Sequence, residues 1–306
     1  MDITRHPFRG LQDMPLVLDL IRAAPPACRH VIDSPWRLTS PSIAAGRDSV
    51  YWQDADGRAV ALAAWQQAWA ALDFYIRPGL PAATATDIEQ ELFGWAGQRF
   101  RQQDAERGHP VPYAVEFRDD DEDRRRLATA HGFTRHGEGY VYFEHELGEL
   151  PPRPALPDGF TTRPLAGAVE AAAYAAADRA AFANDAMTAR WRERTLCAPL
   201  YDPGLDLVVT APDGTIAGFC VGWHHPARGV AQIEPLGVRP DFRRRGLARA
   251  LLVEMLHGFR TRGASVAAVE TETNLGREPA RAAYAAVGFT QAHLISRWEA
   301  WAAEIA

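Results

Sequence analysis

Three arginines in a row followed by a glycine form the part of the sequence best suited to hold a ligand. The segment "VRPDFRRRGLARALL" runs from Val238 to Leu252. Apolar residues recur at helical spacing after Gly246, so a helix is predicted to begin there. The first N–H groups of a helix have no internal partner and carry the positive end of its dipole. Because glycine lets a ligand approach the backbone and arginine adds positive charge, the segment predicts an anion site.

The anion is not expected to be a nucleoside triphosphate or a nicotinamide dinucleotide. The sequence contains neither a GxxxxGK[ST] loop nor a GxGxxG loop after a strand. No Ser/His/Asp or Cys/His set stands out that would indicate a covalent intermediate.

The elements around this segment predict an α+β fold. Alternating and apolar runs indicate strands at 159–165, 205–211, 216–225, 229–238 and 265–271, with a last strand or pair after 288. Helical spacing indicates helices at 168–182, 187–196, 247–259 and 278–288. Antiparallel strands thus precede one strand–helix–strand crossover. The expected architecture is a mixed, mostly antiparallel sheet with flanking helices.

Composition argues against several classes of protein. The chain has 306 residues, 47% of them hydrophobic, and a net charge of −6, whereas a general nucleic-acid binder is usually basic. Its three cysteines form no CxxC pair and no metal-binding pattern, so no metal is expected. The start lacks the apolar segment of a signal peptide, and no apolar run approaches membrane-spanning length. A cytoplasmic protein is expected.

The two halves of the chain repeat one pattern. The triplet GFT occurs at 132–134 and again at 288–290, an offset of 288 − 132 = 156 residues. The turns "DADG" and "APDG" are offset by 214 − 57 = 157, and "FYIRP" and "LGVRP" by 236 − 74 = 162. A proline-rich stretch lies between the halves. The sequence therefore predicts two copies of one domain, 1–150 and 159–306, joined by a linker at 151–158.

The second half resembles the GNAT family of N-acetyltransferases. That family's acyl-CoA motif, R/Q-x-x-G-x-G/A after a strand ending in Val-x-Pro, is met by Arg243, Gly246 and Ala248. Asn274, Tyr284 and the pair at 288–289 match the family's following Asn, Tyr and Gly-Phe in order and spacing. The resemblance covers 159–306 and implies a sheet whose two central strands separate around the arm of acetyl-CoA.

The resemblance also assigns roles to particular residues. Backbone groups of Leu236, Gly237 and Val238 would hold the pantetheine arm. Backbone N–H groups of the run Arg243, Arg244, Arg245, Gly246, Leu247 and Ala248 would take the pyrophosphate. Asn274 would bind near the arm or near Tyr284, although capping its own loop is an alternative. No residue identifies the acceptor.

Two residues are candidates for proton transfer. Tyr284 is expected to protonate the departing thiolate, with a plain core aromatic as the alternative. Glu234 lies in an apolar strand, where burial could raise its pKa and make it a base, unless it simply faces solvent. Glu270 and Glu272 at the next strand end could attract a cationic acceptor.

The first half keeps the outline of this pattern without its chemistry. The register of the arginine–glycine loop is occupied by the uncharged residues 81–86. Ala128 stands where Tyr284 stands, because each lies four residues before its Gly-Phe pair. We expect 1–150 to be a degenerate, non-catalytic copy.

The sequence as a whole predicts an N-acetyltransferase. Acetyl from acetyl-CoA would pass to a primary amine of a small molecule by direct attack in a ternary complex, in a monomer or homodimer that binds neither nucleic acid nor membrane. An acceptor amine on a peptide or protein is an alternative. A non-catalytic acyl-CoA-binding scaffold is another, and a nucleic-acid module using the three arginines is a third.

Overall fold

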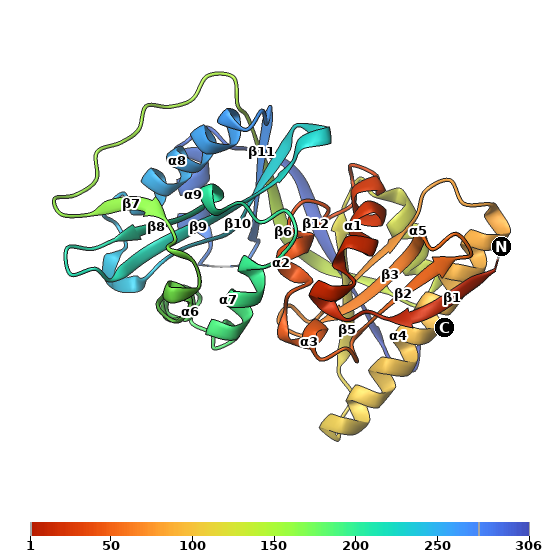
Figure 1. The fold of residues 1–306 in the computed structure, drawn as a ribbon. Helices are drawn as coiled ribbons and strands as arrows, with labels where there is room; N and C mark the ends of the chain where they lie inside the picture. Colours follow the sequence, from red (N-terminus) through yellow and green to blue (C-terminus); the bar gives the residue numbers. More distant parts are fainter. Residues whose placement is uncertain (1, 275, 306) are drawn as a thin grey trace. The chain divides into compact units, whose positions relative to one another are not determined.

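The computed structural model describes residues 2–274 and 276–305, which form two compact units. Unit 1 comprises 1–140 together with 293–306, and unit 2 comprises 141–292. Each unit is a sheet covered by helices, which confirms the α+β class (Figure 1).

Unit 1 is built mainly from antiparallel strands, with order β1-β2-β3-β4-β5-β12. The first five strands are β1 (Ile3–Pro7), β2 (Ser49–Asp54), β3 (Ala59–Gln66), β4 (Ala71–Ile76) and β5 (Pro112–Arg118). Its helices are η1 (Gly10–Gln12), α1 (Met14–Ala23), α2 (Ser34–Arg37), α3 (Pro41–Ala44), α4 (Ala82–Arg107) and α5 (Glu122–Ala130). Trp52, Trp65 and Phe93 lie in its core.

Unit 2 repeats this plan, with order β6-β11-β10-β9-β8-β7. Five of its strands are β7 (Thr161–Pro164), β8 (Asp206–Thr210), β9 (Ile216–His225), β10 (Val230–Val238) and β11 (Val266–Glu272). Its helices are η2 (Gly167–Glu170), α6 (Ala171–Phe182), α7 (Ala189–Leu196), η3 (Pro203–Leu205), η4 (Pro226–Arg228), η5 (Pro240–Phe242), α8 (Leu247–Thr261) and α9 (Glu278–Ala285). Helix α8 packs on β9 so closely that a Cβ at Gly222 would overlap Met255 and Phe259.

The last strand of each half is exchanged between the units. Strand β12 (Thr290–Trp301) leaves unit 2 after Ala292 and pairs with β5 of unit 1, from Ile295–Arg118 to Trp301–Pro112. Strand β6 (Thr134–Glu146) leaves unit 1 after Tyr140 and lies beside β11 of unit 2. Each unit is thus completed by a strand from the other half of the sequence.

The two GFT glycines show how tightly the exchanged strands fit. Gly132 and Gly288 both have positive φ, 84° and 102°. A Cβ on Gly132 would come within 2.5 Å of the Glu304 carbonyl oxygen, and one on Gly288 within 2.8 Å of His145. Because backbone and ring occupy that space, both positions require glycine for conformation and for room. The first glycine therefore packs against the end of the second half, and the second glycine against the first half.

The compact units accordingly differ from the two continuous halves expected from the sequence. The division falls at 140–141, and residues 293–306 belong to unit 1. The proline-rich stretch lies inside unit 2, where Arg153 pairs with Glu254 and the Pro151 carbonyl lies 3.1 Å from His257 Nε2. The physical reason for this difference is that a β-strand can form its backbone hydrogen bonds with any sheet edge whose hydrophobic pattern fits it. A domain present in two copies can therefore take up the equivalent strand of the other copy.

Candidate functional site

Strands β10 and β11 of unit 2 are paired over only part of their length. The parallel register covers four residue pairs, from Val230–Val266 to Ile233–Val269. A register irregularity follows between Ile233 and Leu236, and β10 then continues to Val238 beside β9. The predicted separation of two central parallel strands is thus present in unit 2.

The orientation of the β10 backbone decides which groups face this separation. The N–H of Arg239 donates to the Ala217 carbonyl of β9 at 2.9 Å. Since neighbouring residues in a strand point their polar groups to opposite sides, Gly237 also faces β9, whereas Leu236 and Val238 face away. Close packing requires a glycine at position 237, because a Cβ there would lie 2.4 Å from the ring of Phe219. Leu236 and the N–H of Val238 therefore offer the edge for an extended ligand arm, whereas the Val238 carbonyl accepts from Arg243.

Helix α8 starts immediately after the glycine turn. Gly246 precedes its first residue with φ of +80°, and no side chain caps the helix. A Cβ built on Gly246 would meet no heavy atom within 4 Å, so the glycine is required by backbone conformation and not by crowding. The first N–H groups of α8 are left for an external acceptor, which is the geometry of an anion site.

The three arginines beside this helix differ in their contacts and conformation. Arg243 turns inward and donates from Nε to the Val238 carbonyl at 3.1 Å and from Nη2 to the Ala181 carbonyl at 2.8 Å. Arg245 packs along the rings of Phe160 and Phe242. Arg244 adopts a left-handed φ of 60°. Arg243 thus ties the end of β10 to α6, a structural role that sequence reasoning missed.

Tyr284 lies at the other end of the separated strands. It is 5% exposed and packs against Phe143 and Phe289, at centroid distances of 5.8 and 6.0 Å. Burial raises the pKa of its hydroxyl well above the usual value, and the charge of Glu234 raises it further. Tyr284 therefore stays protonated at neutral pH, as a proton donor must, and Glu234 is close enough to affect it.

Asn274 lies in the exposed loop after β11. Its amide nitrogen donates to Glu272 Oε2 at 2.7 Å, and Arg277 Nε donates to the same oxygen at 3.0 Å. This carboxylate holds the loop together ahead of α9 and turns the Asn274 amide toward Glu272.

A buried polar cluster beside β8 and β9 was not foreseen from the sequence. Arg192 of α7 pairs with Asp206 and lies over the ring of Tyr174 at 3.8 Å. Asp178, one helical turn after Tyr174 in α6, is 5% exposed. Tyr174 and Asp178 are four residues apart in an alanine-rich helix, and that spacing is the signal that could have revealed the cluster.

Asp178 is expected to make the stability of unit 2 depend on pH. Burial raises the pKa of its carboxyl to about 7, against the opposing charges of Arg192 and Arg179. The folded state therefore keeps this proton from about pH 4 to pH 7, where the unfolded chain releases it, so the contribution to stability falls as pH rises through that window. Asp178→Asn should remove the dependence and raise the melting temperature at pH 8 relative to wild type.

Thermal unfolding of both proteins between pH 4 and pH 8 measures this difference. Asp185→Asn, at an exposed position in the same unit, is the control for losing one carboxylate. Parallel melting curves for wild type and Asp178→Asn across the range would show that Asp178 is ionised in the folded protein.

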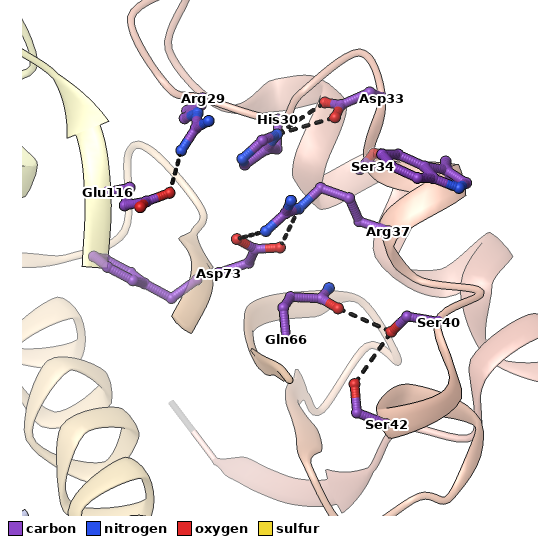
Figure 2. A network of polar contacts seen from close by, with 12 residues as sticks. Arg29, His30, Asp33, Ser34, Arg37, Ser40, Ser42, Gln66, Asp73 and Glu116 are labelled. Atoms are coloured by element: carbon purple, nitrogen blue, oxygen red, sulfur yellow. Dashed lines mark hydrogen bonds and ion pairs between the residues drawn. The ribbon is translucent and has the colours of Figure 1, made fainter. Parts of the chain in front are cut away.

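Unit 1 has the corresponding strands but a different interior. Strands β4 and β5 pair in parallel at Ala71–Ala114. Beyond it, Asp73 of β4 accepts two hydrogen bonds from Arg37 at 2.7 and 2.9 Å, and Glu116 of β5 accepts from Arg29 (Figure 2). Where unit 2 has a glycine turn, Pro81 precedes α4 directly.

One family of known proteins matches a segment of unit 2. The profile of the Acetyltransferase (GNAT) family matches residues 172–289, which include α6 to α9 and the glycine turn. This segment of the chain therefore carries a domain similar to the GNAT family. The GNAT resemblance drawn from Arg243, Gly246 and Ala248 is thereby confirmed.

Curated proteins similar to this chain include several mycothiol acetyltransferases. The one from Kineococcus radiotolerans is 35% identical over 143 residues, 45% of each chain. The one from Tsukamurella paurometabola is 32% identical over 152 residues, 42% of this chain and 52% of the relative. The chain thus spans about half the length of the curated relatives it matches.

Solved structures extend the similarity to the whole fold. A tandem GNAT protein from the clavulanic acid biosynthesis pathway aligns with a TM-score of 0.64 and 16% identity, over 98% of this chain and 99% of the other. A GNAT protein from Sphaerobacter thermophilus aligns with a TM-score of 0.60 and 23% identity, over 98% and 96%. These alignments confirm two GNAT-like domains in tandem.

Residues 2–274 and 276–305 contain no group of three or more His, Cys, Asp or Glu side chains placed to hold a metal ion. In the same residues, no helix combines the length and the apolar character needed to cross a bilayer.

Proposed function

We propose that this protein is an N-acetyltransferase whose unit 2 binds acetyl-CoA and transfers the acetyl group to a primary amine of a small molecule in the cytoplasm. The observation on which this depends is the uncapped N-terminus of α8 at Gly246, next to the edge of β10 that faces away from β9. The helix end suits the pyrophosphate and the strand edge suits the amides of the pantetheine arm. The names of the curated relatives support acetyl as the group and a small molecule as acceptor.

The residues at the end of the separated strands have the properties that aminolysis of a thioester needs. Glu234 would accept a proton from the attacking amine, directly or through water. The new C–N bond forms as the C–S bond breaks, and Tyr284 would donate its hydroxyl proton to the leaving sulfur. Asn274 would help to order the loop beside this point.

Direct transfer is favoured over an acyl-enzyme by the state of Cys220. This thiol is fully buried in β9 and is close enough to Tyr284 to affect its pKa. Burial raises the pKa of Cys220 well above the usual value. Because the thiolate and not the thiol is the nucleophile, Cys220 is unsuited to take the acetyl group.

Acetyl-CoA turnover with a panel of primary amines tests the proposal. We expect release of free CoA thiol that depends on the amine, and an N-acetylated product detectable by mass spectrometry. Binding of acetyl-CoA with no amine-dependent thiol release for small molecules or peptides would instead indicate a scaffold that only binds the thioester.

Tyr284→Phe separates catalysis from binding. It removes the hydroxyl and leaves the ring packed on Phe143 and Phe289. Turnover should fall by about 10² or more, because loss of a general acid typically costs this much, while acetyl-CoA affinity stays within about twofold. Phe143→Leu, a change in the packing around the ring, is the control. Unchanged turnover in Tyr284→Phe would remove Tyr284 from the acid role.

We assign unit 1 a supporting role, as a degenerate copy that does not catalyse transfer. Ala128 replaces Tyr284, Pro81 and not a glycine directly precedes α4, and the run of three arginines is missing from the loop before it.

A further inference from the structure

Unit 1 presents the same strand edge that unit 2 offers to a ligand. "FYIRP" and "LGVRP" align Phe74 with Leu236 at an offset of 162. The N–H of Arg77 donates to the Val60 carbonyl of β3, as that of Arg239 does to β9 in unit 2. By the same alternation, Phe74 faces away from β3, toward the separation between β4 and β5. An acyl-CoA arm in unit 1 would therefore need the carbonyl of Phe74.

That carbonyl is already occupied by a side chain of unit 1. The guanidinium of Arg124 donates to the Phe74 carbonyl and lies 4.3 Å from the centroid of the Phe74 ring. The same nitrogen, Nη2, also lies 2.8 Å from the sulfur of the buried Cys28. Asp121, which caps α5 by accepting from the N–H of Arg124 at 3.1 Å, also pairs with its guanidinium at 3.4 Å. Arg124 is thus fixed in this position at both ends.

The matching position in unit 2 has no such side chain. Arg124 is the third residue of α5 and Ala280 the third residue of α9. Their offset, 280 − 124 = 156, equals that of the two GFT triplets. A methyl group cannot reach across to a neighbouring strand. The difference between Arg124 and Ala280 at equivalent positions therefore decides whether a side chain bonds the strand edge. It does so in unit 1 and cannot do so in unit 2.

We propose that the Arg124 guanidinium occupies, in unit 1, the place that the amide arm of acyl-CoA takes in unit 2, so that the chain binds one acyl-CoA and not two. The N-terminus of α4 is still present, with Pro81 before it and no side-chain cap. Unit 1 therefore excludes acyl-CoA by two features. It has lost the arginine–glycine loop, and the Arg124 guanidinium fills the position that the amide arm would need. The inference depends on the proposed function only through the unit 2 site with which unit 1 is compared.

Binding stoichiometry of the full chain is the first test. Calorimetry with acetyl-CoA should give one equivalent for the wild type and none for Gly246→Asp, which alters unit 2 alone. Two equivalents for the wild type would overturn the inference, whereas one equivalent that survives Gly246→Asp would count against the anion site at α8. No binding to the wild type would instead refute the proposed function of unit 2.

Opening the position is the second test, with free pantetheine as the probe because it needs no phosphate site. Equilibrium dialysis should give one equivalent of pantetheine for the wild type, bound in unit 2, and two for Arg124→Ala. Arg125→Ala, which removes the next arginine, paired with Glu122 on the surface, is the control and should bind one equivalent. Circular dichroism checks the fold, and Arg124→Ser, which also shortens the side chain, replaces the alanine variant if that one unfolds. A folded Arg124→Ala or Arg124→Ser variant that binds no second equivalent would overturn the inference.

Discussion

Gly246→Asp is expected to abolish acetyl-CoA binding and leave the fold intact. The new carboxylate would stand at the N-terminus of α8, where the pyrophosphate is proposed to lie, and like charges brought together there cost several kcal/mol. We expect calorimetric affinity to fall by at least about 100-fold. The fold should survive, because the space around Gly246 is open and the cost of a left-handed aspartate is about 1 kcal/mol.

Two further variants show whether the charge is the cause. Gly246→Asn has the same size and tolerates left-handed φ, so it should retain much more affinity than Gly246→Asp. Gly214→Asp places a carboxylate at another glycine of unit 2 with φ near +84° and open space, in the turn between β8 and β9, and should bind acetyl-CoA normally. If Gly246→Asp and wild type bind equally well, the anion site at α8 is wrong.

The fragment 159–306, the second half as the sequence delimits it, is expected not to fold. It lacks the part of β6 that belongs to unit 2 and the residue that follows it, and so loses Val141, Phe143 and Leu147, which are 3–7% exposed. Burial of such side chains contributes about 1.5–3 kcal/mol each, and three of them approach the whole stability of a typical domain of about 5–15 kcal/mol. The fragment 141–292, which is unit 2 as one continuous segment, should unfold cooperatively and bind acetyl-CoA.

The two fragments are nearly equal in length, so size does not explain a difference between them. Circular dichroism melts and calorimetry on both fragments measure the effect. Adding a peptide of 134–150 to 159–306 should restore part of the fold, because it supplies β6. If 159–306 alone melts and binds acetyl-CoA as 141–292 does, β6 is dispensable for unit 2.

Much of the fold follows from local patterns in the sequence. The predicted strands 216–225 and 229–238 appear as β9 and β10, and the helix predicted from 247 starts at Leu247. These elements were predictable because their hydrophobic period is dictated by one buried face. The turn at Gly246 was predictable because a lone glycine between a strand and a helix has few other roles.

The rest depends on contacts between residues far apart in the sequence. The exchange of β6 and β12 could not be predicted, because two copies of one domain offer equivalent edges and the pattern of either strand fits both. The inward turn of Arg243 and the contact of Arg124 with Phe74 were also hidden. An arginine that bonds a carbonyl and one that faces solvent look identical in a sequence.

The exchanged strands bear on how such a gene can change over time. After a duplication, one redundant copy is normally free to be deleted once it has lost its activity. Here deletion of the first half would take β6 away from the copy that retains the acyl-CoA motif, so an inactive half would be kept by selection on its partner. Substitutions inside it, such as those that leave Arg124 and Ala128 where the other half has Ala280 and Tyr284, would remain permitted as long as β6 is preserved.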